Sequence, residues 1–81
     1  MHYVYIIRSS RTGSYYVGST EDLWNRLGEH NSGENKSTRS GIPWVLVHVE
    51  EFPTRSEARN KENRIRSRGI SRYLKQISKT A

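Results

Sequence analysis

The sequence of 81 residues contains no cysteine, and this absence excludes two kinds of chemistry. Disulfides cannot cross-link the fold, and thiolates cannot hold a structural metal. No apolar run approaches the roughly 20 residues that a membrane-spanning helix needs, and no signal peptide is visible. We therefore expect a cytoplasmic protein without a membrane partner, built as a single domain over residues 1–81.

Apolar and acidic residues are both scarce. Hydrophobic residues make up 32% of the chain, so two Trp, five Tyr and one Phe supply much of the area that a thin core can bury. Eight Asp and Glu stand against 14 Lys and Arg, which gives a formal net charge of +6. This charge on a small body favours a polyanion partner, most often nucleic acid. The alternative is a solvated basic surface that has no ligand.

The first 20 residues have the pattern of a β-hairpin. Residues 2–8 (HYVYIIR) and 14–19 (SYYVGS) are rich in β-branched and aromatic residues, which favour strands. A Thr-Gly pair between them supplies the turn. Pairing of the two strands predicts that Tyr5 lies near Tyr16.

The first predicted helix covers residues 21–31, with Thr20 as its N-cap. Arg26 and His30 share one stripe of this helix with its two leucines, at spacing i, i+3, i+4, i+7. Half of the stripe that should cover a core is therefore polar. After a polar loop, a nearly continuous apolar run over residues 44–51 predicts the central or most buried strand of the sheet.

The second predicted helix covers residues 55–67 and begins with a capping box at Thr54. Glu62 lies between Ala58 and Ile65, the two apolar residues of its core stripe. A lone buried carboxylate is costly unless it is paired or binds a metal. Its position therefore indicates either an ion pair or a metal site.

A last helix over residues 71–79 follows the helix breaker Gly69. The predicted order is β-β-α-β-α-α. This order indicates an α+β fold, a small three-stranded antiparallel sheet flanked by helices.

These polar side chains have the composition of a one-metal phosphodiesterase. An ion held by Glu62, a phosphate held by Arg26 and a phenol or imidazole that moves a proton would complete it. A tyrosine can serve as the base if a nearby cation lowers its pKa.

The same residues resemble the GIY-YIG nucleases. The first motif is Tyr3-Val4-Tyr5, with Tyr3 in place of Gly, and the second is Tyr16-Val17-Gly18, with Val17 in place of Ile. The motif tyrosines are 11 residues apart, an arginine follows the second after ten residues, and a histidine follows after four more. The small stand-alone bacterial type resembles this chain from end to end.

The resemblance implies hydrolysis of DNA phosphodiester bonds with one Mg²⁺ or Mn²⁺ per site, and a role in DNA repair. It implies a role for each matching residue: Glu62 as the metal ligand, Arg26 on the scissile phosphate, Tyr5 as general base, His30 tuning that base or shuttling its proton, Tyr16 orienting water or phosphate, Gly18 allowing close backbone approach, and Tyr3 as a second reachable phenol.

Each of these residues also has a plain structural explanation. Tyr5 and Tyr16 could be packing residues of strands, and Arg26 a surface arginine. His30 could cap the end of its helix. Glu62 could pair with an arginine three residues before it or four after it on the same helix.

Two other functions remain open on the sequence. The chain could be a nucleic-acid-binding module without activity, or a subunit to which a protein partner supplies specificity. The chain has no second domain to read bases, so we expect a nuclease to select branched, flapped or single-stranded DNA by its shape. Contacts to the DNA backbone are expected among Lys36, Arg39, Arg64, Arg66, Arg68 and Arg72, with none singled out.

Overall fold

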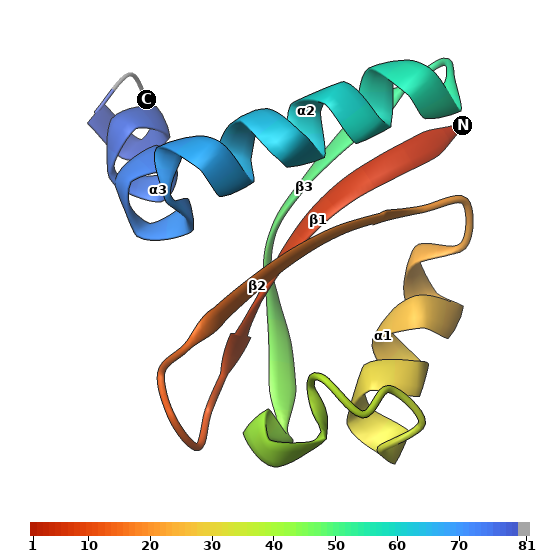
Figure 1. Cartoon of the computed structure of the whole chain (residues 1–81), viewed down its shortest axis with the longest axis vertical. Helices are drawn as coiled ribbons and strands as arrows, with labels where there is room; N and C mark the ends of the chain where they lie inside the picture. The colour runs from red at the N-terminus through yellow and green to blue at the C-terminus, as the bar shows by residue number, and fades with distance from the viewer. Residues whose placement is uncertain (80–81) are drawn as a thin grey trace.

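The computed structural model describes residues 1–79, and its elements follow the predicted order (Figure 1). They are β1 (His2–Ser9), β2 (Tyr15–Thr20), α1 (Leu23–Ser32), a 3₁₀ turn η1 (Arg39–Gly41), β3 (Trp44–Phe52), α2 (Arg55–Arg68) and α3 (Ile70–Lys79). The α+β fold with a three-stranded antiparallel sheet is confirmed. Within the described residues, no helix has the length and hydropathy to cross a bilayer.

The central strand of the sheet is β1, because the strand order is β2-β1-β3. The prediction that residues 44–51 form the central strand was therefore wrong. Their apolar run is not buried on both faces: Val45, Val47 and Val49 are 52%, 42% and 40% exposed. A shift of register opposite Ile6 and Ile7 interrupts the pairing of this edge strand with β1.

The two faces of the sheet carry separate cores (Figure 1). On the face covered by α2 and α3, alternate residues of β1 pack against these helices. The opposite face lies against α1 and the segment that follows it. The first cluster consists of Val4, Ile6, Val17, Ala58 and Ile65, and the second of Tyr5, Ile7 and Trp44 with Tyr16, Leu23 and Leu27 around them.

The largest difference between the predicted and observed helix ends is at the start of the first helix. Helix α1 begins at Leu23, and its N-cap is Asp22, whose carboxylate accepts the backbone N–H of Asn25. Thr20 was predicted as the cap, but its hydroxyl accepts the N–H of Asp22 at 3.1 Å and shapes the turn before the helix. Thr54 caps α2 as predicted.

Candidate active site

Tyr5 lies in the middle of the central strand and is 2% exposed. Its phenol extends over Gly18, which pairs with it on β2. A Cβ atom at Gly18 would lie 2.5 Å from the Tyr5 hydroxyl oxygen, so any side chain there would displace the phenol. Gly18 therefore leaves room for a side chain of the neighbouring strand.

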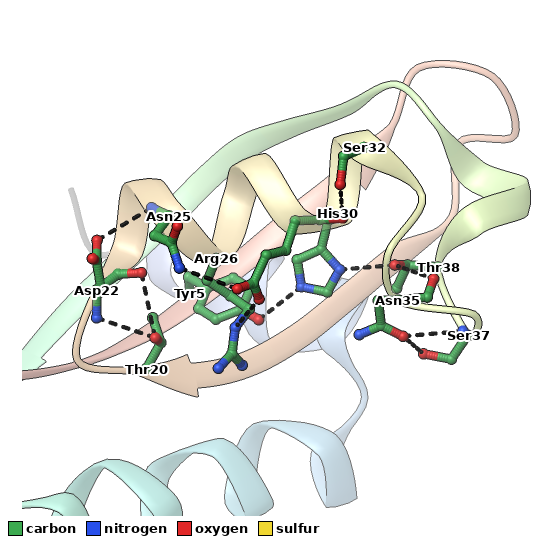
Figure 2. A network of polar contacts seen from close by, with 11 residues as sticks. Tyr5, Thr20, Asp22, Asn25, Arg26, His30, Ser32, Asn35, Ser37 and Thr38 are labelled. Atoms are coloured by element: carbon green, nitrogen blue, oxygen red, sulfur yellow. Dashed lines mark hydrogen bonds and ion pairs between the residues drawn. The ribbon is translucent and has the colours of Figure 1, made fainter.

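A buried chain of hydrogen bonds begins at this phenol (Figure 2). The Tyr5 oxygen lies 2.9 Å from Nε2 of His30, and Nδ1 of His30 lies 2.8 Å from the Thr38 hydroxyl. His30 is 0% and Thr38 1% exposed. Both nitrogens of His30 are occupied, so His30 does not act merely as a cap for the end of its helix.

The two titratable groups of this hydrogen-bonded chain, Tyr5 and His30, are held in their neutral forms. Burial and, as a smaller contribution, neighbouring Tyr16 raise the pKa of Tyr5 to about 12, although the guanidinium of Arg26 acts in the opposite direction. Burial, with the charge of Arg26, lowers the pKa of His30. The sequence-based hypothesis required a nearby cation to lower the pKa of the tyrosine. In the protein alone this requirement is not met, because burial of Tyr5 outweighs the effect of Arg26.

Arg26 and Tyr16 complete the cluster on the α1 face. Arg26 lies one turn before His30, beside the phenol of Tyr5, and its Nε is 3.1 Å from Oε1 of Glu29 (Figure 2). The ring of Tyr16 is centred 5.0 Å from that of His30 and 6.5 Å from that of Tyr5. The predicted proximity of Tyr5 and Tyr16 is confirmed, and four of the predicted site residues meet on one face.

Glu62 lies on the other face of the sheet, and its side chain is 14% exposed. The Ser19 hydroxyl donates to its Oε1 at 2.7 Å, and Nη2 of Arg66 lies 2.5 Å from its Oε2. Arg66 Nη2 also donates to the backbone carbonyl of Val17. The ion pair with an arginine four residues later, one of the alternatives for Glu62, is thus present.

The two faces of the sheet are in electrostatic reach of each other at β2. Successive residues of a strand point to opposite sides, so Gly18 faces the phenol while Ser19 faces Glu62. The negative charge of Glu62 raises the pKa of Tyr5, so the two groups interact across this strand.

The carboxylate of Glu62 is compatible with a hard divalent ion. Mg²⁺ keeps several of its waters and binds through one or two carboxylates together with phosphate oxygens of a substrate. Within residues 1–79 no group of three or more His, Cys, Asp or Glu side chains could form a complete metal site. Each oxygen of Glu62 has one donor, which leaves lone pairs for an ion.

Sequence reasoning missed two residues of this arrangement. Thr38 lies in a segment that reads as a polar loop, and no local pattern marks it as the partner of His30. Ser19 is one residue after the second motif, and only its pairing with α2 reveals its contact to Glu62. Tyr3, the second phenol considered, has no contact to His30, and Tyr5 occupies that position.

Comparison with known proteins agrees with this geometry. The model of the GIY-YIG catalytic domain matches residues 1–74. The chain belongs to the GIY-YIG family. Similar members of this family are a UPF0213 protein of Halobacterium salinarum, 44% identical over 94% of this chain and 96% of its own length, and one of Staphylococcus saprophyticus, 38% identical over 95% and 94%.

A solved member has the same fold. The solution NMR structure of a UPF0213 protein from Bacillus halodurans aligns with a TM-score of 0.58 at 35% identity, over 95% of this chain and 82% of that one. GIY-YIG proteins form a nuclease superfamily, which gives the coarse class of activity for this chain.

Proposed function

We propose that this GIY-YIG protein is a divalent-metal-dependent endonuclease that hydrolyses DNA phosphodiester bonds. The observation that carries the proposal is the buried chain from Tyr5 through His30 to Thr38, which lies beside a guanidinium. Any buried phenol needs one hydrogen-bond partner, but here the partner is an imidazole that is itself hydrogen-bonded through its second nitrogen. An aligned imidazole behind a phenol is a route for a proton.

The direction of the hydrogen bonds supports a relay. The Thr38 hydroxyl has one proton, and it donates this proton to the backbone carbonyl of Asn35 at 3.4 Å. Thr38 then accepts from Nδ1–H of His30, which leaves Nε2 without a proton. Nε2 therefore accepts the hydroxyl proton of Tyr5, and the phenol oxygen is free to accept a proton from water.

This relay explains how a phenol with a raised pKa can serve as the base. As Tyr5 takes a proton from the attacking water, it passes its own proton to Nε2 of His30, so no free phenolate has to exist beforehand. The lowered pKa of His30 keeps its imidazole neutral and able to accept at pH 7. Tyr16 orients the water or the phosphate beside them.

Arg26 would bind the reacting phosphate directly, and Glu62 would act on it through a metal ion. Arg26 is a planar donor that fits two phosphate oxygens and stabilises the charge that develops on them. Glu62 would hold one Mg²⁺ or Mn²⁺, which as a Lewis acid stabilises negative charge on the phosphate and the leaving oxygen. The ion pair with Arg66 leaves a lone pair on each carboxylate oxygen for this ion.

Selection of branched or single-stranded DNA by shape is part of the same proposal, as is a setting in DNA repair. A subunit to which a protein partner supplies specificity is the alternative. Shape selection is supported by the arginines of the described residues, which suit phosphate groups, because contacts to phosphate carry no base-sequence information. Equal cutting of linear duplex and branched DNA would contradict it.

The test is nicking of supercoiled plasmid and of a branched DNA by wild type and by Glu62→Gln, with Mg²⁺ or Mn²⁺. We expect the variant to lose cleavage by about 10²-fold or more while it still binds DNA, because one ligand of a single ion is gone. Glu57→Gln, an exposed carboxylate on the same helix, is the matched control and keeps its activity.

Two results would overturn the proposal. Equal cutting by wild type and Glu62→Gln would mean that this carboxylate is not the ligand or that the activity is a contaminant. Binding without cutting by wild type and both variants would favour a binding module or a partner-dependent subunit.

A further inference from the structure

A polar cleft of about 510 Å³ opens next to the candidate site. It lies between the first turns of α1 and α2, where the end of β2 passes between them. Arg26 and Ser19 line it, and these residues also contact the two halves of the site. Arg55 and Arg59 of α2 line the remaining wall. A nucleic-acid strand that lies in this cleft would therefore lead to the phenol of Tyr5 and the carboxylate of Glu62.

The acidic residues of the cleft are engaged with other groups. Glu21 lies 3.4 Å from Nε2 of His2, and the carboxylate of Asp22 caps α1 by accepting from Asn25. Neither carboxylate forms an ion pair with an arginine across the cleft. The guanidinium groups of Arg26, Arg55 and Arg59 face two carboxylates there, so the lining keeps a net positive charge.

Arg55 and Arg59 differ from the other arginines near the site. Arg26 pairs with Glu29, and Arg66 pairs with Glu62. Among residues 1–79, neither Arg55 nor Arg59 has a hydrogen bond or an ion pair, and both side chains are exposed. Exposed guanidinium groups without a carboxylate are available for an anion from outside.

The spacing along α2 puts these arginines in line with Glu62. Positions 55, 59, 62 and 66 recur every three or four residues, so they share one face of the helix. Arg59 lies less than one turn before Glu62, and Arg55 about one turn further away. An anion at Arg59 and an ion at Glu62 would therefore be close neighbours.

We propose that Arg55 and Arg59 form a binding site for a backbone phosphate of the DNA strand, adjacent to the phosphate that is cleaved. The inference rests on the proposed function only where it places this site next to the cleaved phosphate. The cleft and its unpaired arginines are observed independently of that function. The two guanidinium groups hold the strand in register, so that the neighbouring phosphate falls between Arg26 and Glu62. None of the backbone contacts expected from the sequence included these two residues.

The experiment compares two double variants with equal loss of charge. Arg55→Gln/Arg59→Gln removes the proposed site. Arg11→Gln/Lys75→Gln is the control, because these two exposed cations lie in the hairpin turn and on α3, outside the cleft and outside the set of backbone contacts expected from the sequence. Binding of a fluorescent single-stranded and a branched oligonucleotide is followed by anisotropy in EDTA, over a series of salt concentrations.

We expect the first pair to weaken binding about 10-fold and to lower the salt slope by about 1 to 2, since each phosphate contact releases counterions. The control pair should weaken binding by less than about threefold. Equal losses in the two pairs, or a larger loss in the control, would overturn the inference. Circular dichroism of both variants excludes a loss of folding.

The failure of this inference and the failure of the proposed function look different. Binding in EDTA involves no catalysis, so a selective loss supports the phosphate site even if wild type does not cut. If wild type cuts and both pairs bind alike, the nuclease stands and the site at Arg55 and Arg59 falls.

Discussion

The two faces of the central strand β1 show how one strand serves two purposes. On the α2 and α3 face, Val4 and Ile6 pack among other apolar side chains. On the α1 face, Tyr5 meets His30 and Thr38, both fully buried. Within residues 1–79 every buried polar side-chain atom has a hydrogen-bond partner, including those of this face.

The two faces of β1 contribute to stability in different ways. The apolar face gains free energy by removing surface from water, and it tolerates exchange of one apolar residue for another of similar size. The polar face avoids a penalty only while each donor finds its acceptor. Substitutions on the first face should change folding, and substitutions on the second should change chemistry.

The largest expected effect separates Tyr5→Phe from Ile6→Ala, two neighbours on β1. Tyr5→Phe removes the proton donor of the relay and should lower DNA cleavage by about 10²- to 10⁴-fold. Ile6→Ala should lower the free energy of unfolding by about 2–5 kcal/mol and leave cleavage per folded molecule unchanged. Urea unfolding and plasmid nicking measure the two. Normal cleavage by Tyr5→Phe would show that the Tyr5 hydroxyl takes no part in the reaction.

A smaller effect is expected at Thr38, which positions His30 without touching the substrate. Thr38→Val keeps the shape but leaves Nδ1–H without an acceptor, at a cost of about 1–3 kcal/mol. We expect His30 to exchange its protonated nitrogen, which its ¹⁵N shifts report, and kcat to fall about 10-fold at unchanged KM. Thr38→Ser should restore both. An unchanged tautomer in Thr38→Val would contradict the assigned direction of the hydrogen bonds.

The smallest effect is the response of the two faces to acid. The pKa of His30 is lowered from 6.5 mainly by burial, so the unfolded chain binds more protons and stability decreases as pH falls below about 6.5. On the other face, Glu50 accepts from Tyr73 and lies 2.8 Å from Nε2 of His48. Burial would raise the pKa of Glu50, but these hydrogen bonds and Lys61 outweigh burial and lower it below 4.5.

The stability contributed by Glu50 is therefore complete above about pH 4.5 and is lost as pH falls through its lower folded value. Urea unfolding over a pH series should show a first loss from the α1 face and a second, more acidic one from the other face. Glu50→Gln should remove only the second step. If Glu50→Gln removed the first step, the assignment of the steps to the two faces would be wrong.

Local patterns predicted most of the fold. The hairpin, the cap of α2 at Thr54 and the order of elements follow from neighbours in the sequence, and all are present. The place of β3 did not follow, because an apolar run does not tell how many strands will flank it. The cap of α1 was misplaced by two residues, since Thr20 and Asp22 are both good caps and only the turn decides between them.

The candidate site, like the fold, was predicted only in part. Motif spacing indicated Tyr5, Tyr16, Arg26 and His30, and the fold brings them together. The long-range partners could not be predicted: Thr38 joins His30 across eight residues, and Ser19 joins Glu62 across 43. The alternatives for Glu62 also did not exclude each other, because an ion pair with Arg66 leaves lone pairs free on the carboxylate.

The edge position of β2 limits how this fold can grow. The cleft lined by Arg26, Arg55 and Arg59 borders the last residues of this edge strand. A fourth strand hydrogen-bonded to the end of β2 would compete with a ligand for this cleft, so we expect an enlarged sheet, or a second chain that adds a strand, to build on β3. Of the two edge strands, β2 is thus the one kept free for the reaction and β3 the one available for assembly.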